Sequence, residues 1–154
     1  MAQFGSLGRQ GRRQARMVMR FADWLFANPE GPRSPVRVVA WWEARRLAFN
    51  VIIGVYGFIS LGIFFWALAT SGQLQPGEDA VEPIALFGAL FGINILYTLG
   101  SLVEIPARIF APGLSHRFGP LLLKSGLGLG LLLITLPAAF WLGYRLLQWF
   151  GIAW

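Results

Sequence analysis

The fold is decided by the stretch 83-PIALFGALFGINILYTLGSLVEIPAR-108, in which residues 83–103 carry no charge. At about 1.5 Å per residue, a helix of this length crosses the roughly 30 Å hydrocarbon core of a bilayer. Small residues (Ala85, Gly88 and Gly92) repeat at helical spacing on one of its faces, where a second helix can pack closely. The stretch therefore predicts a membrane-spanning helix that lies between other helices.

A polar stripe follows another face of this segment toward one membrane surface. Its members share one side of the predicted helix and are Asn94, Thr98, Ser101, Glu104 and Arg108. A carboxylate at this depth is costly unless it is paired or hydrated. Glu104 is therefore either a functional group or half of an ionic clasp with Arg108 or Arg117. Because Glu104 lies at the end of the uncharged run, we favour the clasp.

The composition of the 154-residue chain is that of an integral membrane protein. Hydrophobic residues make up 56% of it and charged residues only 13%, against about 25% charged residues in soluble domains. The sequence contains no cysteine, which excludes disulfides, thiolate catalysis and cysteine-ligated metals. We expect an all-α fold with three membrane spans, at about 47–70, 83–105 and 120–144.

The first and third spans carry small and polar residues of their own. Asn50, Gly54 and Gly57 share one side of the first span. The third span contains Gly126 and Gly130 in a GxxxG spacing, a pattern typical of close helix packing. Asn50 and Asn94 are expected to hydrogen-bond between helices or to line a polar pathway. Two prolines should disturb the spans: Pro106 should end or bend the second, and Pro137 should kink the third.

A helix start and a set of interfacial residues precede the first span. Ser34 and Pro35 have the residue types of an N-cap and a first helical turn. Indole rings and guanidinium groups favour the headgroup region. On that basis we predict interfacial anchors at Trp24, Trp41, Trp42, Arg45, Arg46 and Trp149. Glu43, which lies among these arginines, should be paired locally.

Residues 1–33 form a basic leader that we distinguish from the transmembrane domain, residues 34–154. An amphipathic helix is expected from Gln14 to Ala27, with an aromatic side and a basic side, as in helices that lie in the headgroup region. Packing on a partner subunit is the alternative for this helix. An arginine-rich start without acidic residues also fits a mitochondrial presequence, but a cytoplasmic leader that binds anionic lipid is favoured.

The distribution of basic residues predicts the orientation of the chain. Nine arginines precede the first span, and Arg108 and Arg117 lie between the second and third spans. Among the opposite connections, only the C-terminal tail has an arginine, Arg145. Because basic residues remain in the cytoplasm, we expect the N-terminus inside and the C-terminus outside, in a bacterial inner membrane.

Few residue patterns in this sequence are suited to chemistry. The single histidine, His116, excludes paired-histidine haem and histidine-rich metal sites. No metalloprotease, nucleophile-elbow or nucleotide-binding motif occurs. No catalytic residue and no cofactor is therefore predicted, while a bound lipid or pigment stays open. The concentration of basic residues next to a membrane span indicates anionic lipid, not nucleic acid, as their partner.

The leading hypothesis is a non-catalytic accessory or scaffolding subunit of a larger membrane complex. Each predicted span has a close-packing glycine face, whereas few polar groups are left for chemistry. The partners would then be other membrane-protein subunits. The alternative is a small homo-oligomeric transporter or channel, lined by the polar stripe of the second span.

Overall fold

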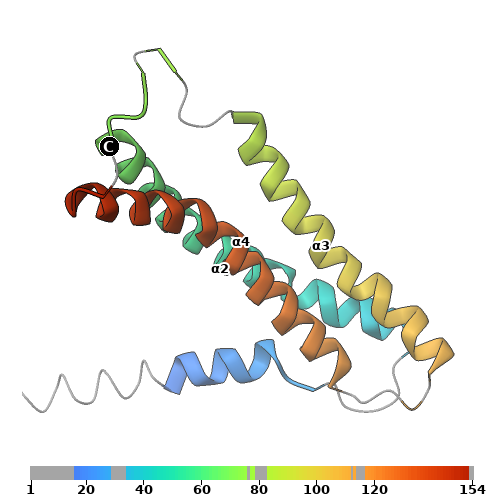
Figure 1. Ribbon diagram of the computed structural model, residues 1–154. Coiled ribbons are helices and arrows are strands. Elements are labelled where there is room, and N and C mark those ends of the chain that lie inside the picture. Colours follow the sequence, from blue (N-terminus) through green and yellow to red (C-terminus); the bar gives the residue numbers. More distant parts are fainter. Residues whose placement is uncertain are drawn as a thin grey trace, which may run out of the picture.

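The computed structural model describes residues 16–28, 34–75, 77–78, 83–111, 113 and 117–152. In these residues it is all-helical, with a short helix at residues 16–25 followed by three long ones. The long helices are α2 (Pro35–Thr70), α3 (Pro83–Phe110) and α4 (Phe118–Trp149) (Figure 1). Each is long and apolar enough to cross a membrane, which confirms the expected three-span class. His116 lies outside the described residues.

Helix α2 begins as the sequence predicts. The Ser34 side chain accepts a hydrogen bond from the Arg37 amide, and Pro35 occupies the first turn. The helix is 36 residues long, or about 54 Å at 1.5 Å per residue, and so exceeds the hydrocarbon thickness. Its first three turns therefore precede the uncharged run at 47–70 and carry the tryptophan and arginine residues of the predicted interface.

Neither Pro106 nor Pro137 ends a helix. Pro106 lies within α3, which continues to Phe110, and Pro137 lies within α4, which continues to Trp149. Of the two effects predicted for Pro106, an end or a bend of the second span, the end is wrong, because the helix runs past Pro106. A proline removes one backbone donor and crowds the preceding turn, but packing against neighbouring helices holds such turns in membrane proteins.

The three long helices form an open bundle. Contacts pair early residues of α2 with late residues of α3, so these helices are antiparallel, whereas α2 and α4 run parallel and pack most extensively. Toward its N-terminal end, α3 leans away from both neighbours (Figure 1). Residues 84–91 are accordingly all exposed. The core lies instead where the C-terminal half of α3 meets the first turns of α2 and α4.

Candidate functional site

The centre of the core is a buried carboxylate. Glu104 of α3 is 0% exposed and accepts two hydrogen bonds from side chains of different helices. The Trp42 indole Nε1 of α2 donates to its Oε2 at 2.9 Å, and the Arg108 Nε donates to its Oε1 at 2.8 Å. A buried charge is tolerated only when it is paired and hydrogen-bonded, and the ion pair with Arg108 is one of the two pairs that the sequence predicts for Glu104. We call Trp42, Glu104 and Arg108 the carboxylate cluster.

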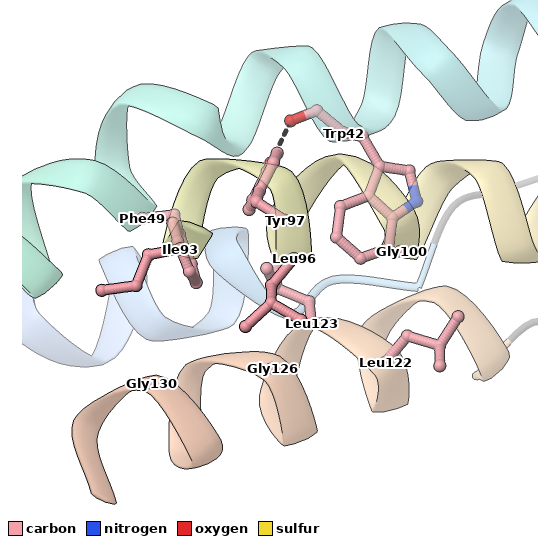
Figure 2. Close-up of a pocket in the computed structure, with 10 residues that line it drawn as sticks. All are labelled: Trp42, Phe49, Ile93, Leu96, Tyr97, Gly100, Leu122, Leu123, Gly126 and Gly130. Carbon is pink, nitrogen blue, oxygen red and sulfur yellow. Dashed lines mark hydrogen bonds between the residues drawn. The ribbon is translucent and has the colours of Figure 1, made fainter. Parts of the chain in front are cut away.

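Aromatic packing holds the Trp42 ring in place beside the carboxylate. The Tyr97 hydroxyl donates to the Trp42 backbone carbonyl, and its ring lies edge-on to the indole at a centroid distance of 5.2 Å (Figure 2). Phe49 packs on the other side of Tyr97, with ring centroids 4.7 Å apart. These contacts fix the indole so that its N–H is directed at Glu104.

Gly100 makes room for the same ring. A Cβ atom added to Gly100 would overlap the Trp42 indole, with Cζ3 at 2.8 Å and Cζ2 at 2.9 Å. Figure 2 shows the indole lying against this glycine on α3. The position therefore requires glycine for close approach. The sequence-based packing faces did not include Gly100, although it lies about two turns beyond Gly92 on the same helix.

Arg45 joins the N-terminal helix to the bundle. Its Nε donates to the Leu25 carbonyl at 2.9 Å and its Nη2 to the Trp24 carbonyl at 2.8 Å. These carbonyls lie in the last turn of the helix at residues 16–25, where the regular helical bonds run out, and the Trp24 carbonyl also accepts a long bond from the Ala27 amide at 3.3 Å. The guanidinium also stacks on the Trp41 ring, 4.0 Å from the centroid. Arg45 thus caps one helix from another.

The other basic groups at this end of the bundle make similar local contacts. Arg46 forms an ion pair with Glu43 at 2.6 Å, which confirms the predicted local pairing of Glu43. It also approaches the Thr98 hydroxyl at 3.4 Å and the Tyr97 ring at 4.9 Å. The Lys124 ammonium lies 5.0 Å from the Phe26 ring centroid. Arg46 of α2 therefore contacts α3, and Lys124 of α4 contacts the N-terminal segment.

Three of the predicted interfacial anchors lie in a different environment from the one expected. Trp41, Trp42 and Arg45 are buried, with Trp42 only 2% exposed. The Trp42 indole donates to the Glu104 carboxylate, and the Arg45 guanidinium donates to backbone carbonyls inside the protein, where lipid headgroups were predicted as partners. The remaining anchors keep exposed surface: Trp24 and Trp149 are exposed, and Arg46 is partly exposed.

Most of the polar stripe is used within α3 itself. Asn94 donates to the Leu90 carbonyl, Thr98 to the Asn94 carbonyl and Ser101 to the Thr98 carbonyl. The structure therefore gives Asn94 an intrahelical bond where one between helices was expected. Asn50 is partly exposed on α2. The side chains of Asn94, Thr98 and Ser101 thus bond to backbone carbonyls of their own helix, a common arrangement for polar residues in membrane helices.

The predicted glycine faces divide into two groups. Gly57 and Gly130 face the α2–α4 interface, where an added Cβ would lie 4.0 Å from Ile134 and 3.1 Å from Ile53, respectively. The other group has no atom within 4 Å of such a Cβ and consists of Gly54, Gly88, Gly92 and Gly126. The second group therefore has no close-packing partner within the described chain.

Two polar contacts between α2 and α4 were missed by sequence reasoning. The Ser60 hydroxyl donates to the Ile134 carbonyl at 2.8 Å. The Tyr56 and Thr135 hydroxyls are 2.6 Å apart. The Ile134 carbonyl lies within one turn of Pro137, where α4 lacks a backbone donor. A serine in an apolar run gives little warning of such a bond, because its partner is a backbone atom.

The pocket at the centre of the core is small. Among the described residues there is no group of three or more His, Asp or Glu side chains able to hold a metal ion. The pocket beside Trp42 and Gly100 measures only about 30 Å³ and is lined mainly by apolar side chains (Figure 2). Comparisons with family models, curated proteins and solved structures yield no match to this chain.

Proposed function

We propose that the protein is a non-catalytic scaffolding subunit of a larger membrane-protein complex in a bacterial inner membrane. The observation that carries this proposal is the unpacked glycine face of α3, where Gly88 and Gly92 have no atom within 4 Å of an added Cβ. The partner would be a transmembrane helix of another subunit, lying against the half of α3 that leans away from α2 and α4.

Helix energetics support a partner at this face. Glycine in a helix interior costs about 1 kcal/mol relative to alanine. Contact with lipid does not offset this cost, whereas the absence of a side chain lets the backbone of a neighbouring helix approach closely. The two glycines sit one turn apart with Ala85 preceding them, so the smooth surface is long enough for a helix crossing.

The use of the polar groups supports a structural role. Glu104 is held by Trp42 and Arg108, and the hydroxyls of Thr98 and Ser101 bond to carbonyls of α3. A general acid or an ion-binding carboxylate needs access to substrate or ion, and Glu104 is fully buried. The cluster therefore fits a fixed clasp that sets the angle between α2 and α3.

The proposed orientation places the carboxylate cluster at the cytoplasmic end of the bundle. The early turns of α2, the end of α3 and the start of α4 lie at this end, together with the arginines that the positive-inside rule keeps in the cytoplasm. A reporter inserted at Gly113 should then read cytoplasmic, and reporters at Gly77 and after Trp154 should read external. A cytoplasmic reading at Gly77 would contradict this orientation.

The test of the scaffold is a substitution on the open glycine face. Gly92→Leu should abolish co-purification of partner subunits from native membranes, because the new side chain holds the neighbouring helix away. The matched control is Gly128→Leu on α4, a position that also has no atom within 4 Å but lies on another helix. The isolated Gly92→Leu chain should fold normally. If Gly92→Leu leaves the native complex intact, the proposal is wrong.

The transporter or channel is retained as the competing outcome of the same experiments. In that case the open face of α3 would meet a second copy of this chain, and Asn94 would line a shared path. The purified protein would then give flux in liposomes without any other subunit. Flux that disappears in Asn94→Leu while the oligomer persists would replace the scaffold with the channel.

A further inference from the structure

A second pocket lies between the first turn of α2 and the end of α3. It measures about 80 Å³ and is lined by Pro35, Val38, Ile105, Arg108 and Ile109. This volume is several times the roughly 10–15 Å³ that one water molecule needs. Four of the five lining residues are apolar, and the fifth is a cation that belongs to the carboxylate cluster.

Arg108 has donor capacity that the cluster does not use. Its Nε is bonded to Glu104, whereas its Nη2 is buried and has no hydrogen-bond partner among the described residues. The side chain as a whole is 14% exposed. A buried guanidinium nitrogen without an acceptor is costly, and the oxygens of a phosphate group are acceptors that match its planar fork of donors.

The surroundings of the pocket also favour an anion that carries hydrocarbon. The first turn of α2 contains no acidic residue, and the N-terminal end of a helix has a partial positive charge. Val38, Ile105 and Ile109 provide apolar walls next to the guanidinium. The pocket lies beyond the uncharged run of α2 (47–70) and at the charged end of α3, which is headgroup depth in a bilayer.

We propose that this pocket binds the phosphate of an anionic phospholipid, with Arg108 as its ligand and the apolar residues Val38 and Ile109 beside its acyl chains. Arg108 then bridges two anions, Glu104 inside the protein and the lipid phosphate at its edge. The lipid fills the junction of α2 and α3 from the membrane side. This site is separate from the open glycine face and does not depend on the scaffold proposal.

The test uses the full-length chain in neutral detergent after removal of bound lipid. Phosphatidylglycerol is titrated and binding is followed by native mass spectrometry, with phosphatidylcholine and inorganic phosphate as parallel probes. We expect one tightly bound phosphatidylglycerol. Arg108→Gln should weaken it about fivefold, equivalent to about 1 kcal/mol. Arg145→Gln, a matched loss of charge near the end of α4 where Arg145 bonds to Gln148, should weaken it less than twofold.

Two further variants separate lipid binding from folding. Ile109→Trp changes an exposed wall residue without touching the ion pair, and it should block the pocket. Glu104→Gln removes the internal counter-charge of Arg108, so phosphatidylglycerol should bind more tightly than to the parent chain. Equal loss in Arg108→Gln and Arg145→Gln, or parent-like binding by Ile109→Trp, would overturn the proposal. Equal binding of phosphatidylcholine, or displacement of the lipid by millimolar inorganic phosphate, would overturn it as well.

Discussion

The two halves of α3 differ in how closely they approach their neighbours. At the C-terminal half, Tyr97, Gly100 and Glu104 hold α3 against α2, whereas residues 84–91 lean away from the bundle and are exposed (Figure 1). Both halves of α3 contain glycine, but only the C-terminal half also has polar side chains that are hydrogen-bonded to α2. Since lipid is as apolar as the helices, glycine permits close packing but hydrogen bonds and shape decide where it happens.

The largest expected effect comes from removing the Glu104 carboxylate in the C-terminal half of α3, the half that packs against α2. Glu104→Ala leaves the Arg108 guanidinium and the Trp42 indole without their shared acceptor. Breaking one side of a buried pair costs about 3–5 kcal/mol, so the free energy of unfolding, measured by SDS titration, should fall by that amount. Glu104→Gln keeps an acceptor for Trp42 and should lose clearly less. An equal loss in both variants would mean that the charge of Glu104, and not its acceptor atoms, holds the helices.

The second effect concerns the helix at residues 16–25, which Arg45 of α2 joins to the bundle. Arg45→Gln removes the donors that cap the Trp24 and Leu25 carbonyls. Hydrogen bonds from charged groups contribute about 1.5–3 kcal/mol, so amide hydrogen exchange at residues 16–25 should become at least about tenfold faster. Arg46→Gln serves as the control, because Arg46 bonds to Glu43 and Thr98 and to neither of these carbonyls. Unchanged exchange in Arg45→Gln would show that Leu25 alone docks the helix.

The third prediction compares the two halves with one and the same substitution. Gly100→Ala places a methyl group against the Trp42 ring, and overpacking of this kind costs about 1–3 kcal/mol. Gly88→Ala meets no atom within 4 Å and should stabilise the isolated chain slightly, since alanine is the better helix former. Thermal unfolding in mild detergent measures both. Destabilisation by Gly88→Ala in the isolated chain would indicate that α3 packs closely over its whole length.

The sequence predicts the helices and the local ion pairs of this protein better than its interhelical contacts. Uncharged runs locate the spans because the bilayer sets their length, and the Glu104–Arg108 and Glu43–Arg46 pairs follow from helical spacing. The burial of Trp42 was not predicted, because tryptophan beside arginine is equally typical of an interface. One signal was available: Val38, Trp42, Arg45, Phe49 and Ile53 recur at three- and four-residue spacing and are all buried.

The orientation of α3 could not be predicted from its glycines. Ala85, Gly88 and Gly92 form the clearest small-residue pattern in the helix, yet among the described glycines it is Gly100 that a neighbouring side chain approaches most closely. The reason is that Gly100 faces the large Trp42 ring of another helix. Tyr97 and Glu104, which hold this ring, lie 55 and 62 residues from Trp42 in the sequence. A single-helix pattern contains no information about such a partner.

The smallest effect is expected where the two halves of α3 meet. Asn94 lies between the open glycine face and Tyr97, and its side chain bonds to the Leu90 carbonyl of its own helix. Asn94→Leu removes a bond that does not join two helices, so the free energy of unfolding should change by less than about 0.6 kcal/mol, the average for hydrogen bonds between membrane helices. Co-purification of partner subunits should also persist.

Asn94→Leu therefore separates the two proposed functions at a site where stability hardly changes. In a scaffold, the variant should match the parent chain in assembly and in unfolding, because the Leu90 carbonyl keeps its helical bond to the Asn94 backbone amide. In a channel, the same substitution would place an apolar side chain in the conducting path and abolish flux. A loss of assembly without a loss of flux would fit neither role, and would place Asn94 in the contact between α3 and its partner helix.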